Sequence, residues 1–591
     1  MIYSKIPLAQ TIIELCKSKN IQHIIISPGS RNAPLTIGFT EDPFFKTYSI
    51  VDERCAAFFA LGIAQQIKMP VVVVCTSGSA LLNYYPAVSE AFYSDIPLVV
   101  ISADRPAYAI DIGDGQTIRQ NNIFDKHILY SANLNQDIRP DEVKLLGDGK
   151  NQPNNLKELS PYSLQSEIQK SNEKEINTAL NIAIEGNGPT HINAPFEEPL
   201  YEIANSLSVK VNNVEPTIVF NKITIESLKP YADIWNTSSR KMMLVGTNSP
   251  DAIESKIINE FFQDESVIVF TETTSNLHHD NFFPSIDKII APIEKAENKD
   301  ELFKKLQPDI LLTFGGMIIS KKIKVFLRKY KPKHHWHIDI KKAYDTFFCI
   351  EKHFKVCPNH FLNTFNTLIK NKESNYHQFW YSIKKQRDVI HSKYLSNIQF
   401  SDLKVFEQVL ESIPNNYQLQ LSNSSTIRYV QLFDINSTLK VFCNRGTSGI
   451  DGSTSTAVGA SVVNNNPTLF ITGDLSFFYD SNALWNNYIK NDFRIVVVNN
   501  KGGGIFRILP GNKQSENFEK YFETSHNLNA SHICEMYKIE YLTASSKDDL
   551  KNTLHSFYNK SSSPKLLEIF TPRKINDKVL VDYFTFLNEN S

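Results

Sequence analysis

Short apolar runs alternate with helix-length amphipathic stretches along almost the whole chain. In the first third, the runs at 21–27, 71–76, 97–103 and 191–195 consist largely of β-branched and other apolar residues. A strand that is apolar at nearly every position is typical of a parallel sheet buried on both faces. Each interval between the runs is long enough for a helix, so the pattern predicts βαβ units.

The same pattern recurs twice more along the chain. Strands are predicted at 241–246, 267–271, 309–316 and 334–340, and then at 418–422, 441–444, 468–472, 495–499 and 565–570. Residues 371–396 are charged and aromatic and predict a long connecting helix. We therefore expect an α/β protein with three doubly wound parallel-sheet domains. The first domain is expected at 1–205, with a polar surface insertion near 147–174, the second at 206–370 and the third at 401–591. A linker helix is expected at 371–400.

Composition and charge narrow the class of protein. A chain of 591 residues is too long for one hydrophobic core, and its formal net charge is −1. That balance indicates no nucleic-acid partner and no charge-driven membrane partner. No uninterrupted apolar run is long enough to span a bilayer, and residues 1–20 resemble an amphipathic helix rather than a signal peptide. Seven cysteines without a CxxC pair favour reduced thiols and a cytoplasmic location.

Two successive strands of the third block end in residues suited to a metal ion and a diphosphate. Asp474 follows the first strand within Gly473-Asp474-Leu475, and Asn500 follows the second, 26 residues later, with Lys501 between it and three glycines. Carboxylate and amide oxygens are hard ligands of the kind Mg²⁺ prefers, and glycines let the backbone approach phosphate oxygens. Either segment alone reads as an ordinary turn, but the two together predict a magnesium–diphosphate site.

An acidic residue in the first block forms a second candidate. Glu53 stands where a strand ends and a helix rich in small apolar residues begins. One interpretation is a first-turn acid stabilised by the helix dipole. The other is a carboxylate that takes part in chemistry at the end of the sheet.

Five motifs together resemble the SEPHCHC synthase (MenD) family of thiamine diphosphate enzymes over nearly the whole chain. They are SPGSRNAPLT at 27–36, VDER at 51–54, NRGTSGIDG at 444–452, GDLSFFYD at 473–480 and NNKGGGIF at 499–506. The resemblance implies a pyrimidine-binding first domain, a central domain and a diphosphate-binding last domain. It implies a transferase that joins 2-oxoglutarate to isochorismate with loss of carbon dioxide, as in menaquinone biosynthesis. The implied cofactors are thiamine diphosphate and Mg²⁺ (or Mn²⁺), and the implied assembly is a homodimer or homotetramer.

The resemblance also assigns cofactor-binding roles. Glu53 would activate the cofactor through its pyrimidine ring nitrogen. Asp474, Asn500 and the Gly502 carbonyl would hold the metal ion, while Ile450 would wedge beneath the cofactor to keep it bent. The further cofactor-binding candidates are Ser448, Gly473, Leu475, Ser476 and Ile505.

The substrates that the resemblance implies are dicarboxylates, which cations with planar, bidentate reach bind well. Five arginines in loops or at helix starts could bind such dicarboxylates: Arg31, Arg105, Arg119, Arg428 and Arg445. Each alone could be a solvated surface charge. By resemblance, Ser424 and Arg428 would bind the succinyl carboxylate. The candidates for isochorismate or the adduct are Arg31, Arg105, Gln116, Lys321 and Arg445, with Ser30 and Phe506 nearby and Gln116 also a catalytic candidate. Ile505 and Phe506 would form an apolar wall or simply start a core helix.

Two positions depart from broader patterns. Leu475 replaces the last glycine of the general GDG signature, which agrees with the MenD pattern, and Lys322 stands where we expect arginine, so the planar guanidinium fork is lost there.

Two alternative functions stay open: another thiamine diphosphate-dependent 2-oxoacid decarboxylase or synthase, and a catalytically silent subunit that binds the cofactor. The cluster at 334–337 holds three histidines, but on a strand only His335 and His337 share a face, which argues against zinc.

Overall fold

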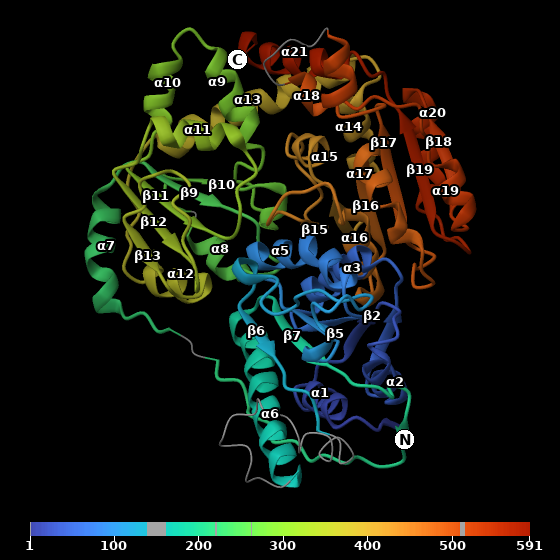
Figure 1. Cartoon of the computed structure of the whole chain (residues 1–591). Coiled ribbons are helices and arrows are strands. Elements are labelled where there is room, and N and C mark those ends of the chain that lie inside the picture. The colour runs from blue at the N-terminus through green and yellow to red at the C-terminus, as the bar shows by residue number, and fades with distance from the viewer. Residues whose placement is uncertain (1, 139–160, 219–220, 262, 509–514, 591) are drawn as a thin grey trace. The chain divides into compact units, whose positions relative to one another are not determined.

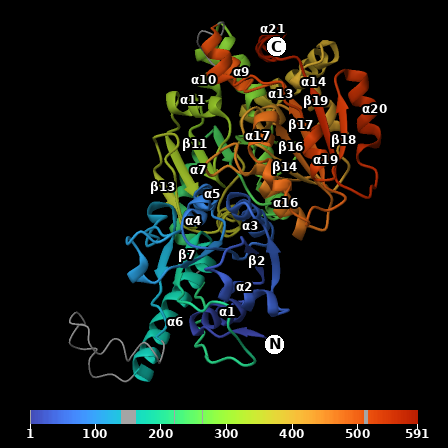
Figure 2. The same ribbon diagram turned by 45° about the vertical axis from the view of Figure 1, so that its right-hand side comes forward.

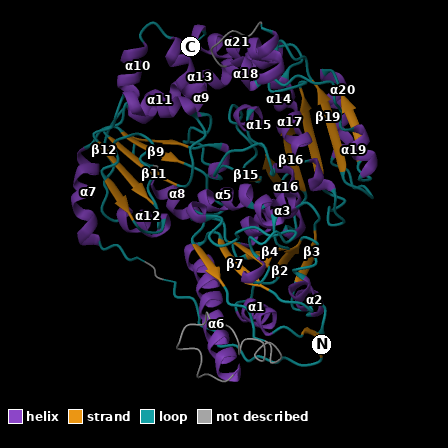
Figure 3. Ribbon diagram, viewed as in Figure 1, coloured by secondary structure: helices purple, strands orange, loops and turns teal. Residues whose placement is uncertain are grey.

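Three parallel sheets organise the computed structural model, which describes residues 2–138, 161–218, 221–261, 263–508 and 515–590. The strands are drawn in orange in Figure 3. The chain forms two compact units. Unit 1 comprises Met1–Ile218, Gly446–Asn465 and Tyr479–Lys490, and unit 2 comprises Val219–Arg445, Asn466–Phe478 and Asn491–Ser591. The two units are described in turn.

The sheet of unit 1 has the strand order β3-β2-β4-β5-β7-β6, with every neighbouring pair parallel. These strands are β2 (His23–Ile26), β3 (Lys46–Ser49), β4 (Val71–Cys75), β5 (Leu98–Asp104), β6 (Tyr130–Asn133) and β7 (Thr190–Pro195), and β1 (Tyr3–Ser4) pairs separately with β8 (Ile203–Ala204). Strands β4 and β5 are buried at every position, as expected for central strands of a covered sheet.

Helices cover both faces of this sheet. Figure 1 shows α1 (Pro7–Ser18) and α6 (Pro161–Gly186) on one side, and α3 (Glu53–Ile67) and α5 (Tyr85–Ser94) on the other. The unit also contains α2 (Ala33–Glu41), α4 (Ser79–Asn83), η1 (Ala107–Ala109), η2 (Asp125–His127), α16 (Ser453–Val463) and η7 (Ser481–Leu484). Helices α3 and α16 touch backbone to backbone, because a Cβ on Gly62 would lie 2.1 Å from the Thr456 carbonyl oxygen.

The first sheet of unit 2 has the order β10-β9-β11-β12-β13 and is also parallel. Its strands are β9 (Lys241–Val245), β10 (Val267–Phe270), β11 (Ile310–Phe314), β12 (His334–Ile338) and β13 (Lys352–Phe354). One apolar cluster packs α7 (Ile225–Thr237) and α12 (Pro358–Asn366) on one face of this sheet. A second packs α9 (Ile286–Lys295), α11 (Lys321–Lys329) and α13 (Tyr376–Asn397) on the other face. Also present are α8 (Ser255–Phe261), η6 (Thr273–Ser275) and α10 (Lys299–Leu306).

The second sheet of unit 2 has the order β15-β14-β16-β17-β19-β18, again parallel throughout. Figure 2 shows β16, β17, β19 and β18 side by side. The strands are β14 (Gln418–Leu421), β15 (Lys440–Cys443), β16 (Thr468–Gly473), β17 (Arg494–Asn499), β18 (Glu540–Ala544) and β19 (Lys565–Phe570). The helices are α14 (Asp402–Ser412), α15 (Ser425–Val430), α17 (Asp474–Tyr479), α18 (Ile505–Ile508), η8 (Phe518–Phe522), α19 (Ser531–Met536), α20 (Lys547–Phe557) and α21 (Asn576–Glu589).

Every strand predicted from the apolar runs is present, and the α/β class with three parallel sheets is confirmed. The strands that the pattern missed in these sheets are β3, β6, β13 and β18, and all four lie at sheet edges. An edge strand has a neighbour on one side only, so it carries polar positions that hide it in the sequence. In β18, for example, only the last of five residues is buried.

The polar stretch expected to be a surface insertion differs in part from that expectation. Residues 139–160 lie outside the described part of the chain, but from Pro161 onward the stretch is the first half of α6. Gln169 on this half donates to the Thr11 hydroxyl of α1 at 2.8 Å. The apolar face of α6 begins only at Ile176, so its earlier, polar half gave no periodic signal.

All seven cysteines lie in described segments and are free thiols. Among the helices of the described segments, none combines the length and the apolar character needed to cross a bilayer.

Candidate active site

Two predicted metal ligands lie at the ends of neighbouring strands in unit 2. Strands β16 and β17 pair in parallel with Gly473 opposite Val498, so their carboxyl ends lie side by side. Asp474 is the first residue of α17 after β16, and Asn500 follows β17 directly. Both are buried, as is suitable for groups that hold an ion away from bulk water. The fold therefore brings together the two residues that the sequence singled out first.

The carboxylate of Asp474 is held from three sides. Its Oδ2 accepts a hydrogen bond from the Gly502 amide at 2.9 Å, and its Oδ1 accepts from the Leu475 amide at 2.6 Å. The Nε2 atom of His526 lies 3.3 Å from Oδ2. Gly502 has a φ of +144°, and a Cβ there would lie 2.6 Å from the Glu523 carbonyl oxygen. Only glycine fits this turn, which keeps the backbone close to Asp474.

Asn500 is oriented by a second buried carboxylate that the sequence did not reveal. The Nδ2 of Asn500 donates to Asp402 Oδ2 at 2.9 Å, and the Thr571 hydroxyl donates to Asp402 Oδ1 at 2.6 Å. Burial raises the pKa of Asp402 to about 6. Since the amide nitrogen is engaged, the Asn500 oxygen is the atom left to act as a ligand. A carboxylate, an amide oxygen and the Gly502 carbonyl form a set of hard oxygen donors that fits Mg²⁺ or Mn²⁺.

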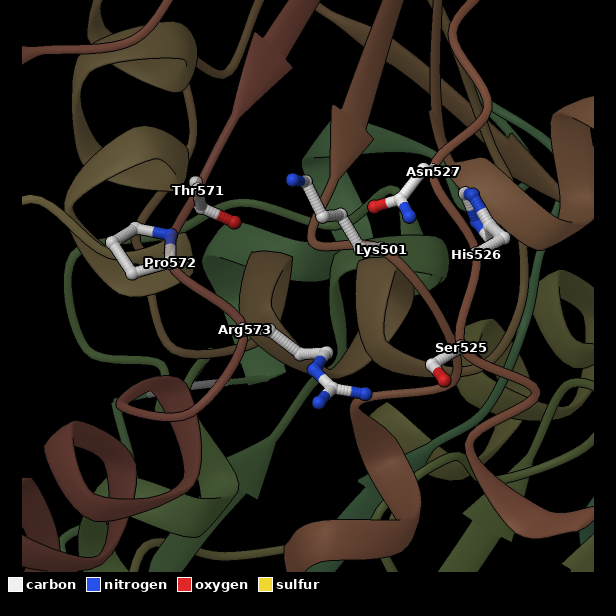
Figure 4. A pocket seen from close by; sticks show the side chains of 7 residues that line it. All are labelled: Lys501, Ser525, His526, Asn527, Thr571, Pro572 and Arg573. Atoms are coloured by element: carbon white, nitrogen blue, oxygen red, sulfur yellow. The ribbon is translucent and has the colours of Figure 1, made fainter. Parts of the chain in front are cut away.

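A polar cavity of about 450 Å³ opens at this end of the sheet. Figure 4 shows Thr571 and Pro572 on one side and His526 and Asn527 on the other, with Lys501 and Arg573 between them. The full lining is Lys501, Ser525, His526, Asn527, Thr571, Pro572 and Arg573. The Arg573 guanidinium pairs with Glu519 at 3.0 Å, so part of the positive charge is balanced within the unit. His526 belongs both to this cavity and to the surroundings of Asp474.

Three of the predicted substrate-binding residues lie close together in unit 2. Arg428 donates to the Ser424 carbonyl at 2.8 Å, and Arg445 donates to Asn423 Oδ1 at 2.6 Å. The side chain of Arg428 is exposed, and partial desolvation followed by the positive charge of Arg445 lowers its pKa, which indicates that the two guanidinium groups share one region. Ser424 has a φ of +65°, a left-handed conformation that is uncommon for serine and that concentrates at functional sites. The arrangement suits an anion.

The two lysines that start α11 differ in their surroundings. Lys322 forms an ion pair with Glu294, and its Nζ lies 5.7 Å from the ring centre of Phe584. Lys321 is exposed at the first position of the helix. The ammonium group of Lys322 is therefore engaged within the fold, whereas that of Lys321 faces solvent.

A buried glutamate holds the start of α11 in place. Glu272 accepts hydrogen bonds from the Ile319 and Ser320 amides, each at 2.7 Å. The Ser320 hydroxyl donates to Asp287 at 2.5 Å and caps α11 by accepting from the Ile323 amide. Burial raises the pKa of Glu272 to about 7 and also raises that of Asp287.

The remaining candidates in unit 2 lie next to the Asp474 site. Leu475 and Ser476 continue α17 after Asp474, and Ser476 is buried. Ile505 and Phe506 begin α18 and are half-buried, and the Phe506 ring meets that of Phe522 at a centroid distance of 6.1 Å. Half-burial leaves part of both side chains exposed.

Glu53 is the first residue of α3 in unit 1 and does not cap that helix. Asp52 is the capping residue, and its Oδ1 accepts from the Cys55 amide at 3.1 Å. Glu53 is half-buried, and its Oε2 receives one long hydrogen bond from Asn83, at 3.4 Å. Asp52 is thus the cap, and Glu53 stands in the first turn, where the helix dipole favours a carboxylate.

The Gly446–Gly452 loop of unit 1 is fastened by Glu90 of α5, a residue the sequence analysis missed. Glu90 accepts from the Gly446 amide at 2.7 Å, the Thr447 amide at 2.6 Å and the Thr447 hydroxyl at 2.8 Å. It is only 1% exposed. The loop carries Ser448, which has a φ of +61°, and Ile450, which is half-buried. Glu90 thus sets the course of a loop that holds two predicted cofactor contacts.

The candidate substrate residues of unit 1 follow β2 and β5. Arg31 is buried and donates to the Phe196 carbonyl at 2.9 Å, and burial followed by the charge of Arg105 lowers its pKa. Arg105 donates to the Gly115 carbonyl at 3.1 Å, next to Gln116, which has a φ of +57°. Ser30 is exposed beside Arg31. Charge therefore links Arg31 to Arg105, and a hydrogen bond links Arg105 to the residue before Gln116.

Arg119 and the histidines of β12, which the sequence also singled out, have other partners. Arg119 is 82% exposed and pairs with Asp111 at 2.8 Å, as a surface arginine does. His335 and His337 share one face of β12, as expected, and both contact the Thr313 hydroxyl, at 3.0 and 2.8 Å.

The sequence carried little signal for the residues it missed. Asp402 follows Ser401 at a helix start, and Glu90 lies in a helix, so each resembles a common surface acid. His526 lies in a loop without a recognisable motif. Their roles depend on partners 98, 356 and 52 positions away along the chain.

Comparison with known proteins supports a single family. Residues 6–128, 232–421 and 424–569 match, respectively, the thiamine pyrophosphate enzyme N-terminal TPP binding domain, the middle domain of thiamine pyrophosphate enzymes and the C-terminal TPP binding domain. The benzoylformate decarboxylase structure from Polynucleobacter necessarius has a TM-score of 0.67 at 15% identity, covering 96% of this chain and 98% of its own, which shows the shared fold.

Curated relatives are similar over their full length. The 2-succinyl-5-enolpyruvyl-6-hydroxy-3-cyclohexene-1-carboxylate synthase of Christiangramia forsetii is 58% identical, covering 99% of this chain and 100% of the relative. The synthase of the same name from Flavobacterium johnsoniae is 53% identical over 99% of both chains, and that from Porphyromonas gingivalis is 36% identical over 100% of this chain and 98% of its own. This chain belongs to the 2-succinyl-5-enolpyruvyl-6-hydroxy-3-cyclohexene-1-carboxylate synthase family of thiamine diphosphate enzymes.

Proposed function

We propose that the protein joins 2-oxoglutarate to isochorismate with loss of carbon dioxide, giving 2-succinyl-5-enolpyruvyl-6-hydroxy-3-cyclohexene-1-carboxylate in menaquinone biosynthesis. The observation that carries this proposal is the 58% identity to a synthase of that name over 99% of the chain. The paired guanidinium groups of Arg428 and Arg445 support it, because both substrates are dicarboxylates.

The metal ion in this proposal is Mg²⁺ (or Mn²⁺), held by Asp474, Asn500 and the Gly502 carbonyl. Their position at two adjacent strand ends supports the assignment. The proposed cofactor contacts beside them in unit 2 are Gly473, Leu475, Ser476 and Ile505. Ser448 and Ile450, which belong to unit 1, are further proposed cofactor contacts.

When bound, thiamine diphosphate supplies a nucleophilic carbon and an electron sink for the decarboxylation. Glu53 holds a proton at the pyrimidine ring nitrogen, a role supported by a carboxylate that helix capping does not occupy. Ile450 would support the cofactor as an apolar contact. Gln116, whose backbone is left-handed, is the second proposed catalytic residue.

The proposed substrate contacts are mostly cationic side chains. Ser424 and Arg428 bind the succinyl carboxylate. Isochorismate, or the adduct, is oriented by Ser30, Arg31, Arg105, Gln116, Lys321 and Arg445, with Phe506 as an apolar contact. Lys322 is left out because Glu294 engages its ammonium group. Arg31 is buried and Arg105 and Arg445 are half-buried, so their hydrogen bonds to a carboxylate would be charge-assisted and partly shielded from water, whereas Arg428 is exposed.

We also propose three domains at 1–205, 206–370 and 401–591, joined by a linker helix at 371–400, within which α13 lies. A homodimer or homotetramer is the proposed active assembly, and the cytoplasm its location, a compartment that keeps thiols reduced.

The proposal is tested by incubating the protein with 2-oxoglutarate, isochorismate, thiamine diphosphate and Mg²⁺. We expect loss of isochorismate absorbance together with release of carbon dioxide. Carbon dioxide release from 2-oxoglutarate alone, with isochorismate unchanged, would instead support a simple 2-oxoacid decarboxylase. Cofactor binding without any turnover would support a catalytically silent subunit.

A further inference from the structure

We propose that Asp402 is a positioning residue that holds the side-chain amide of Asn500 with its oxygen directed at the metal ion. The inference rests on the proposed function, in which Asn500 is a metal ligand. It adds a residue from α14, distant from both signature motifs in the sequence, to the parts of the protein that prepare the cation site.

The contact is direct and shielded from water. Asn500 Nδ2 donates to Asp402 Oδ2 at 2.9 Å, and Asp402 is 2% exposed while Asn500 is 8% exposed. In such surroundings water cannot replace a lost partner at low cost, so the hydrogen bond determines the orientation of the amide.

Asp402 itself is anchored by two further elements. The Thr571 hydroxyl, directly after β19, donates to Asp402 Oδ1 at 2.6 Å, and the Asp402 amide donates to Asn576 Oδ1, at the start of α21, at 2.9 Å. Each carboxylate oxygen therefore has its own donor. A carboxylate held in this way cannot rotate to follow Asn500, so Asn500 must adapt to it.

Asn500 needs such a partner because its amide group is nearly symmetric in shape. Oxygen and nitrogen occupy nearly the same space in asparagine, so shape alone does not select between the two flipped orientations. In one, the oxygen faces the ion; in the other, the NH₂ group faces it and cannot ligate. A carboxylate accepts hydrogen bonds and donates none when ionised, so it selects the orientation with Nδ2 toward itself and the oxygen toward the ion.

The test uses Asp402→Ala, Asp402→Asn and Thr571→Val in the full-length protein. Mg²⁺ affinity is measured by calorimetric titration at saturating thiamine diphosphate, and the melting temperature of the cofactor-free protein reports folding. We expect Asp402→Ala to weaken Mg²⁺ binding by about 10- to 100-fold, the range typical for residues that orient metal ligands.

Asp402→Asn is the conservative variant. Its side-chain oxygen can still accept from Asn500 while its NH₂ group donates to the Thr571 hydroxyl, so Mg²⁺ affinity should stay within about threefold of wild type. Thr571→Val removes one hydrogen bond from the same carboxylate but leaves the bond to Asn500. It should lower the melting temperature and weaken Mg²⁺ binding less than Asp402→Ala does, because the carboxylate loses one anchor but keeps its bond to Asn500.

Three outcomes would overturn the inference. An equal loss of affinity in Asp402→Asn and Asp402→Ala would show that negative charge, rather than orientation, matters. Unchanged affinity in Asp402→Ala, with Asn500→Ala strongly impaired, would remove the positioning role and leave the metal site intact. Thiamine diphosphate binding that is independent of Mg²⁺ in the wild type would overturn both the inference and the metal role of Asn500.

Discussion

Replacing Glu90 with glutamine should weaken cofactor binding through the Gly446–Gly452 loop. Glu90 accepts two hydrogen bonds at each carboxylate oxygen: the Gly446 amide and Ser94 hydroxyl at Oε1, and the Thr447 amide and hydroxyl at Oε2. Glutamine offers one oxygen only. Its NH₂ group must face at least one backbone N–H of the loop, which leaves that donor buried and unpaired.

The magnitude follows from the chemistry of that lost bond. An unpaired buried donor costs about 1–3 kcal/mol, and more when its partner was charged. A loss of about 2 kcal/mol in the stability of the ordered loop should lower the affinity for thiamine diphosphate by about 30-fold, since about 1.4 kcal/mol corresponds to a factor of ten. The loss should appear in the dissociation constant, because the loop carries the proposed contacts Ser448 and Ile450.

The assay is a fluorescence or calorimetric titration of Glu90→Gln with thiamine diphosphate at saturating Mg²⁺. Ser94→Ala is the matched control, since it removes the 2.7 Å bond from the Ser94 hydroxyl to Glu90 and spares all three bonds to the loop. It should stay within about threefold of wild type. Equal affinities of Glu90→Gln and the wild type, or equal losses in both variants, would refute the reasoning.

Four further substitutions test other parts of the structure. Glu53→Gln should still bind thiamine diphosphate but lose most turnover, and near-normal turnover with bound cofactor would contradict its role. Lys321→Ala should raise the KM for isochorismate, whereas Lys322→Ala, which breaks the pair with Glu294, should lower mainly the melting temperature; the reverse pattern in steady-state kinetics and melting would contradict the assignment. Burial raises the pKa of Glu272 from 4.5 to about 7, so the folded state holds its proton more tightly than the unfolded state. The Glu272 carboxyl should therefore lower the free energy of unfolding by up to about 3 kcal/mol as pH rises from about 4.5 to about 7. The difference in urea midpoint between wild type and Glu272→Gln should change across that window, and a constant difference would contradict the expected pH dependence.

The strands and the metal-ligand pair could be predicted from the sequence for a local reason. Strands β4, β5 and β17 are buried at every position, so their apolar runs are continuous. Asp474 and Asn500 stand directly after two such runs, and parallel strands bring their carboxyl ends to one edge. Edge strands such as β3 and β18 were not found, since partial exposure breaks the pattern.

The sequence by itself determined the α/β class, the motifs and the residue types able to hold a metal ion and dicarboxylates. These depend on local order: apolar runs, turn residues and the spacing between them. Only the tertiary structure decided which carboxylates orient them, because Glu90 meets Gly446 and Asp402 meets Asn500 across hundreds or scores of residues. A buried acid that pairs with distant backbone or amide groups looks, in the sequence, like any acid on a helix. Its environment, and thus its role, exists only once the chain has folded.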